Sequence, residues 1–293
     1  MLELARRYPI RTYLALVYGI VLLVFAIPLL SSSGLGLLPI QLPGAAPFIL
    51  LAAITLAVVA FVITRWADGA AGTRELRSRV FRFRVSPLWY LAALTLLPGS
   101  AIVAAVVAQG GTPLANLAAK PAVLGSAGIS LVVAFLLVNW WEEAGWTGFV
   151  LNRLLRQMHP VSASVVTTWL QGVIHLPLVF ITDGVTNGRV RPEDYPLYLV
   201  ALFVLPIPVR LIITWLYNAS GRSVPIVGLF HAGLGIATGS AFLPEIAPGF
   251  QTAWVYAAFA ILAAVVLALT RGRLGLKPEP VASDAGATRA VAL

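Results

Sequence analysis

Long apolar runs separated by short polar segments dominate this chain of 293 residues. Runs of roughly 18 or more apolar residues are long enough to cross a bilayer as helices. The chain contains eight such runs, near residues 13–31, 46–64, 87–108, 124–141, 161–182, 197–217, 223–243 and 251–270. This pattern predicts an all-α fold, a polytopic transmembrane helical bundle with about eight spans.

The polar segments between these runs are too short to build a second folded domain. Residues 1–277 are therefore expected to form one transmembrane domain, and the small, polar residues 278–293 a disordered cytoplasmic tail. The first run is longer than the core of a signal peptide and lacks a small-x-small cleavage site. We expect it to be a retained span.

Composition excludes several classes of site. Cysteine is absent, so disulfides, thiolate metal ligands and a cysteine nucleophile are excluded. The net charge of +9 would suggest nucleic acid in a soluble protein. Here 59% of residues are hydrophobic and the basic residues flank the apolar runs, so we interpret them as topology signals and expect no nucleic-acid partner.

The basic residues also predict the orientation. One side carries Arg6, Arg7, Arg11, Arg65, Arg74, Arg77, Arg79, Arg82, Arg84, Arg153, Arg156, Arg222, Arg271, Arg273, Lys277 and Arg289. The other side carries only Lys120, Arg189 and Arg191. By the positive-inside rule, we expect a multi-pass protein of the cell membrane with both termini in the cytoplasm.

Three clusters of ionisable residues interrupt the apolar sequence. They are Glu142-Glu143 in NWWEEAGWTGF, His175 in QGVIHLPL and His231 in GLFHAGLG. Charged groups are costly in hydrocarbon, so their presence there indicates a functional site. Arg210, inside the sixth run, needs a partner or a hydrated cavity for the same reason.

The two carboxylates differ in direction, because adjacent helical residues point about 100° apart. One can therefore act as a base while the other supports it. Residues 146–157 have the pattern of an amphipathic continuation of the fourth span. Helix counting puts Glu142 near the cytoplasmic end, His231 roughly 13 Å deep and His175 roughly 20 Å deep. We expect an active-site cavity that opens to the cytoplasm.

Less specific interpretations exist for each cluster. The two glutamates could end a helix within an aromatic belt formed by Trp140, Trp141 and Trp146. Each histidine could simply pack near a helix end, and His159 is expected at the surface. The coincidence of all three clusters on neighbouring spans favours a shared site.

Two mechanisms suit these residues. Glu142, His175 and His231 could hold a divalent metal such as Zn, whose open position would activate water. Alternatively, Glu142 and His175 could activate water directly while His231 donates a hydrogen bond to the oxyanion. The chain contains no HExxH motif, and no cofactor is certain.

The ordered motifs resemble a known family. They are EExGWxG from Glu142 to Gly148, a histidine followed by Leu-Pro at His175, and TWLYNxSGxSxxxxxxxH from Thr214 to His231. The chain resembles the CPBP (CAAX protease and bacteriocin-processing, or Abi) family of intramembrane proteases, relatives of the CAAX prenyl endopeptidases.

The resemblance implies an eight-helix intramembrane endopeptidase, often labelled a metalloprotease, that acts on peptides or membrane-anchored proteins near the cytoplasmic leaflet. It assigns water activation to Glu142 with His175 and oxyanion stabilisation to His231. Glu143 is expected to support them.

Three positions depart from the family pattern. Thr147 replaces the arginine of EExxxR, Gln171 replaces a common phenylalanine, and Gly235 replaces the asparagine of HxxxN. Arg210 could supply the missing positive charge from another helix. Asn139 or Gln171 could supply the missing amide only if the packing brings it into the site.

These departures keep two other functions open. One is a family member that binds a partner without cutting it, as in bacteriocin immunity. The other is a small-solute or ion transporter with a Glu, His and Arg210 relay, although no internal repeat supports it. The use of arginine over lysine and the alanine content are typical of a high-GC bacterium, so a farnesylated peptide is not the substrate we expect.

Overall fold

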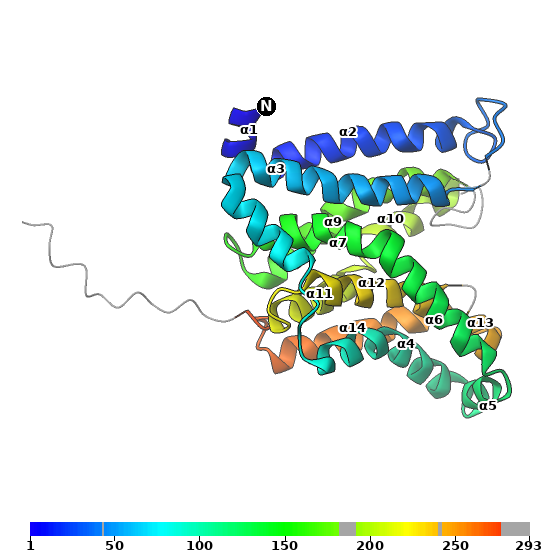
Figure 1. Ribbon diagram of the computed structural model, residues 1–293. Coiled ribbons are helices and arrows are strands. Elements are labelled where there is room, and N and C mark those ends of the chain that lie inside the picture. Colours follow the sequence, from blue (N-terminus) through cyan, green and yellow to red (C-terminus); the bar gives the residue numbers. More distant parts are fainter. Residues whose placement is uncertain (43, 182–191, 240–241, 277–293) are drawn as a thin grey trace, which may run out of the picture.

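The computed structural model describes residues 1–42, 44–181, 192–239 and 242–276, and within these ranges it contains helices and no strand (Figure 1). The all-α class is therefore confirmed. The helices are α1 (Leu2–Arg7), α2 (Pro9–Leu30), α3 (Ala46–Val80), α4 (Pro87–Gln109), α5 (Thr112–Ala119), α6 (Ala122–Ala134), η1 (Phe135–Asn139), α7 (Trp140–Gly145), η2 (Trp146–Leu151), α8 (Asn152–Leu154), α9 (Pro160–His175), η3 (Pro177–Phe180), η4 (Pro192–Asp194), α10 (Tyr195–Phe203), α11 (Ile207–Ala219), α12 (Val224–Thr238), α13 (Leu243–Ile246) and α14 (Thr252–Leu269).

Seven helical segments of the described chain are long and apolar enough to cross a membrane. The predicted seventh run, 223–243, instead contains the 15-residue helix α12. At about 1.5 Å per residue, α12 is roughly 22 Å long and shorter than a typical span. It packs against α4, α7 and α11 in the centre of the bundle, where neighbouring helices cover it. The prediction of about eight spans agrees with seven long segments and this short central helix, and only the length predicted for the seventh run is wrong.

Both ends of the described chain lie at one end of the bundle. Figure 1 shows α1 and the end of α14 together there, with α5 and α13 at the opposite end. An even number of passages through the bundle accounts for this arrangement. The side that faces the cytoplasm stays a prediction. Arg189, Arg191, Lys277 and the predicted tail 278–293 lie outside the described residues.

The segment 65–86, between the second and third apolar runs, is helical for most of its length, because α3 continues to Val80. The continuation buries Leu76, Arg79 and Val80 and leaves the arginines at 74 and 77 exposed. Most of its charged residues therefore belong to the outer face of a helix. The helix bends at Gly69, which has φ 69° and ψ −157°. Glycine adopts this conformation without the steric cost that a side chain would add.

The fourth span also continues past its predicted end at residue 141. Ala122–Leu154 forms one helical run of 33 residues, which includes the π-helical stretches η1 and η2 on either side of α7. The predicted helical continuation is thus confirmed as far as Leu154, but it is not amphipathic, because residues 142–154 are all buried, including Asn152 and Arg153. It puts Glu142 twelve residues, or about 18 Å, from the end of the run. This depth is comparable with those predicted for the two histidines.

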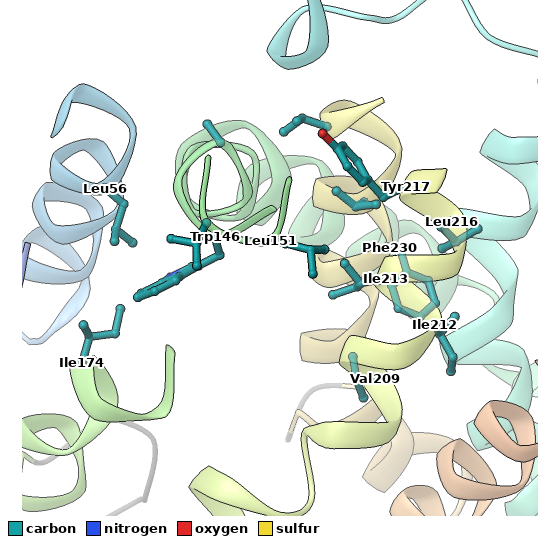
Figure 2. Close-up of a cluster of buried hydrophobic side chains, with 14 of the residues drawn as sticks. Leu56, Trp146, Leu151, Ile174, Val209, Ile212, Ile213, Leu216, Tyr217 and Phe230 are labelled. Atoms are coloured by element: carbon teal, nitrogen blue, oxygen red, sulfur yellow. The ribbon is translucent and has the colours of Figure 1, made fainter. Parts of the chain in front are cut away.

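Apolar side chains from several helices fix α7 in the centre. Figure 2 shows Trp146 directed toward Leu56 of α3 and Ile174 of α9, with α11 and Phe230 of α12 beyond Leu151. Trp146 is fully buried. Gly145 allows this close approach, because a Cβ there would lie 2.3 Å from Tyr13 Oη and 3.1 Å from Leu56 Cβ. The turn that carries the two glutamates is therefore held against α2 and α3.

Candidate active site

Glu143 is the centre of a buried hydrogen-bond network. Its Oε1 accepts from His231 Nδ1 at 2.8 Å and from Arg210 Nη2 at 3.1 Å. Its Oε2 accepts from Arg210 Nη1 at 2.8 Å and from the hydroxyl of Thr147. The side chain is 0% exposed. Four hydrogen bonds occupy the carboxylate, so it has no free oxygen for a reactant. Glu143 therefore fixes the positions of the Thr147, Arg210 and His231 side chains.

Arg210 brings its charge to this network from α11. Its guanidinium also donates to Thr147 Oγ1 at 3.0 Å and to Gln171 Oε1. The hypothesis that Arg210 supplies a positive charge across helices agrees with this geometry. A buried ion pair is tolerated when further hydrogen bonds satisfy both groups, as they do here. The Arg210 guanidinium thus donates to both Thr147 and Gln171, which stand where the family pattern has arginine and phenylalanine.

Glu142 lies beside this network but outside it. Its side chain is 9% exposed, and its Oε2 lies 4.0 Å from His231 Nδ1. Within the described residues it makes no hydrogen bond. Its carboxylate therefore keeps free lone pairs, as a proton acceptor requires.

The two predicted histidines line one cavity of about 450 Å³. His175 ends α9, and its Nδ1 lies 3.0 Å from the carbonyl oxygen of Gln171. If Nδ1 donates this bond, Nε2 is an acceptor. Ser223 caps α12 through a hydrogen bond to Ile226 N, and His231 lies two turns into that helix. The polar lining consists chiefly of Gln171, His175, Arg210 and His231, and the remainder is mostly apolar.

The structure does not bring all of the predicted site residues into contact with one another. Among the described residues, no hydrogen bond or ion pair links Glu142 to His175. Glu142, Glu143 and Asn139 do not line the cavity, whereas Gln171 does. His159 is exposed and caps α9 by accepting a hydrogen bond from Val161 N at 3.4 Å, as expected of a surface residue. The direction in which the cavity opens stays a prediction.

The interfacial interpretation of the glutamates does not fit the packing. Glu143 and Trp146 are both 0% exposed and lie inside the bundle. Trp140, which is partly buried, packs against Phe81 and Phe83, and its Nε1 donates to Val80 O at 2.8 Å. The carboxylates therefore belong to the interior and not to an aromatic belt.

The candidate metal ligands are not arranged as a ligand set. In the described part of the chain, no three His, Asp or Glu side chains are grouped to hold a metal ion. His231 Nδ1 is engaged by Glu143, and His175 Nδ1 by a backbone carbonyl. The side chains as placed do not form a metal-binding set.

Sequence reasoning missed the contribution of α14 and α10 to the cavity. Thr252 and Tyr256 of α14 line it, as do Ala201 and Leu202 of α10. Both helices are apolar and carry no motif, so no sequence signal marked them. Only the packing of α14 against α11 and of α10 against α9 brings them to the site.

Comparison with known proteins agrees with the motifs. Residues 125–237 match the family model described as type II CAAX prenyl endopeptidase Rce1-like. The CAAX prenyl protease 2 of Methanococcus maripaludis is 23% identical over 103 residues, which cover 35% of this chain and 37% of that relative. The alignment thus spans little more than a third of the relative's length. The predicted relationship to the CAAX protease family is confirmed over the segment that carries the motifs.

Proposed function

We propose that this chain, a relative of the CAAX proteases, is an intramembrane endopeptidase that hydrolyses a peptide bond near the cytoplasmic leaflet. One observation carries the proposal: the saturated carboxylate of Glu143 holds Arg210 and His231 beside Glu142, whose own carboxylate makes no hydrogen bond among the described residues. A saturated carboxylate can orient a catalytic group without itself competing for the reactant. The family match over residues 125–237 supports a CAAX-type endopeptidase in general.

Glu142 acts as the general base in this mechanism. A water molecule gives one proton to its carboxylate while the water oxygen attacks the carbonyl carbon of the substrate. His175 Nε2 accepts the second hydrogen of the same water and so orients it. This role requires that Nδ1 donates to the Gln171 carbonyl, which the 3.0 Å separation permits.

His231 stabilises the oxyanion that forms on the carbonyl oxygen. Because Nδ1 faces Glu143, only Nε2 can donate to the substrate, and the ring must then carry hydrogen on both nitrogens. The added positive charge balances the site, since Arg210 is the one other cation that the described residues place beside the two glutamates. A positioned donor of this kind contributes about 100-fold or more to turnover.

In the last step the amine leaves and the general base is regenerated. The proton held by Glu142 passes to the amide nitrogen, the C–N bond breaks and the oxyanion re-forms a carbonyl. Glu142 returns to its ionised form, and the products are an acid and an amine. Glu143, Arg210 and Thr147 do not touch the substrate in this scheme, so they are positioning residues.

The cavity favours a peptide or a membrane-anchored protein as substrate. Its lining combines the polar end at His175 and His231 with apolar side chains such as Val209, Ile213 and Leu234. An extended segment with apolar side chains would bury them there while its carbonyl reaches the histidines.

A peptide-cleavage assay tests the proposal. The full-length protein, purified in neutral detergent, is incubated with a labelled library of membrane-proximal peptides. We expect Glu142→Ala to lower turnover by about 100-fold or more. The matched control is Glu245→Ala, which removes a surface carboxylate paired with Lys120 at the other end of the bundle. Equal turnover by the wild type and Glu142→Ala would contradict the proposal.

A non-cleaving binding protein is the second candidate, because Gly235 replaces the expected amide one turn after His231. No atom lies within 4 Å of a Cβ built at Gly235, so a larger side chain fits there. Gly235→Asn therefore distinguishes the candidates. A large gain in cleavage would identify a weakened protease, whereas no cleavage by either form would favour binding.

A further inference from the structure

A basic hollow lies on α3, away from the cavity between the helices. Arg65, Ala70, Thr73, Arg74 and Arg77 line it, and its volume is about 240 Å³. All three arginines are exposed. The proposed protease mechanism does not use any of these residues.

The bend at Gly69 brings the three arginines together. On an unbroken helix, Arg65 and Arg74 would point about 180° apart, because nine residues make two and a half turns. The positive φ of Gly69 breaks this register. The guanidinium of Arg65 folds back over the bend, with Nη1 3.9 Å from the position of a Gly69 Cβ. Arg65 therefore faces the same hollow as the arginines of the next segment.

The acidic side chains nearby are directed elsewhere. Asp68 pairs with Arg153 at the end of the run that carries Glu142. Glu75 pairs with Arg79 at 2.6 Å and approaches Arg156 at 3.6 Å. Within the described residues, none of the three arginines of the hollow forms an ion pair. Three positive charges thus share one hollow in which the described part of the chain provides no counterion.

We infer that this hollow binds the phosphate of an anionic phospholipid headgroup. Guanidinium groups present paired donors that match phosphate oxygens. A lipid is the source that the location favours, because the hollow follows directly after the apolar part of α3, where headgroups meet the protein. The partly buried Trp66 beside Arg65 is typical of this interfacial level.

Lipid titration of the full-length protein tests this inference. The protein in neutral detergent is titrated with phosphatidylglycerol or phosphatidylcholine, and bound lipid is counted by native mass spectrometry. We expect a preference for phosphatidylglycerol that decreases with salt. The triple variant Arg65→Gln, Arg74→Gln, Arg77→Gln is expected to weaken phosphatidylglycerol binding on the order of tenfold or more. The control triple Arg82→Gln, Arg84→Gln, Arg273→Gln removes the same charge elsewhere and should bind as the wild type.

Two further arms keep the test decisive. Each single variant should weaken phosphatidylglycerol binding about fivefold. The single variants serve as the test if the triple variant does not fold. Gly69→Ala keeps all three arginines but disfavours the bend, so it should also weaken binding. Equal losses in the two triples, or no loss in the hollow variants, would overturn the inference. Displacement of the lipid by millimolar inorganic phosphate would overturn the lipid assignment in favour of a soluble phosphate compound.

Discussion

Arg210 of α11 and Glu143 of α7 form a buried ion pair, with 2.8 Å between Nη1 and Oε2 and with side chains 3% and 0% exposed. The pair joins residues 67 positions apart in the sequence. In the family pattern the arginine would stand at 147, one helical turn after the glutamate. Here Thr147 takes that place and accepts a hydrogen bond from Arg210. In this chain the positive charge that pairs with Glu143 therefore comes from another helix, α11.

Removal of Arg210 is expected to destabilise the protein strongly. Arg210→Met leaves Glu143 ionised and buried without its main partner, which typically costs about 3 to 5 kcal/mol. The measurement is thermal unfolding in detergent beside the wild type. Lys120→Met is the control, because Lys120 forms an exposed pair with Glu245. We expect little change from it. A melting temperature of Arg210→Met equal to that of the wild type would contradict the assigned role of the pair.

An arginine placed at position 147 should compensate for the loss of Arg210. In Thr147→Arg/Arg210→Met, the new side chain lies one turn from Glu143 on the same helix and can use the space that Arg210 leaves. We expect the double variant to be more stable and more active than Arg210→Met alone. Thermal unfolding and peptide cleavage measure the two effects. No recovery in either measurement would mean that α11 must supply the charge.

The two adjacent glutamates should respond differently to the same substitution. Glu142→Gln removes a carboxylate without hydrogen bonds, so turnover should decrease by about 100-fold or more with a small change in stability. Glu143→Gln leaves Arg210 buried without a charged partner, so stability itself should decrease. Turnover and melting temperature are measured for both variants. The opposite result, with Glu142→Gln unstable and Glu143→Gln stable but inactive, would exchange the assigned roles.

Gly145 should tolerate no side chain. Gly145→Ala places a Cβ 2.3 Å from Tyr13 Oη, and overpacking of this kind typically costs about 1 to 3 kcal/mol. Tyr13→Phe removes the clashing oxygen, so Tyr13→Phe/Gly145→Ala should recover part of the loss. Gly235→Ala is the matched control, because the space around it is open. Thermal unfolding compares these variants, and equal losses at positions 145 and 235 would refute the packing argument.

The orientation can be tested with single cysteines, because the chain has none of its own. Ser78 lies on the continuation of α3, and Ser32 follows α2 at the other end of the bundle. Both side chains are exposed. In intact cells, an impermeant maleimide should label Ser32→Cys but not Ser78→Cys. Labelling with the reverse preference would invert the predicted topology.

The apolar pattern determined most of the helices but misplaced two of their ends. The predicted spans end just before Glu142 and Arg65, because charged residues interrupt the apolar runs that define them. In the folded chain, Leu76 turns inward while the polar residues beside it face outward or form ion pairs, so an amphipathic continuation extends α3. The continuation of the fourth span is buried, and its polar side chains have partners within the bundle: Asn152 accepts from Tyr217, and Arg153 pairs with Asp68. The seventh run, 223–243, was too long for the opposite reason, because the helix α12 that it contains ends at Thr238.

The sequence by itself determined which residues carry charge in the apolar bundle, because hydrocarbon makes ionisable groups conspicuous. It identified Glu142, Glu143, His175, His231 and Arg210 in this way. Only the tertiary structure decided how these residues divide their contacts. Whether Arg210 reaches Glu143 depends on how α11 packs against α9, α12 and η2, and apolar contacts between segments distant in sequence set that packing. The same packing saturates the Glu143 carboxylate with hydrogen bonds, leaves the Glu142 carboxylate outside that network and brings α14 to the cavity. Local sequence encodes none of these features.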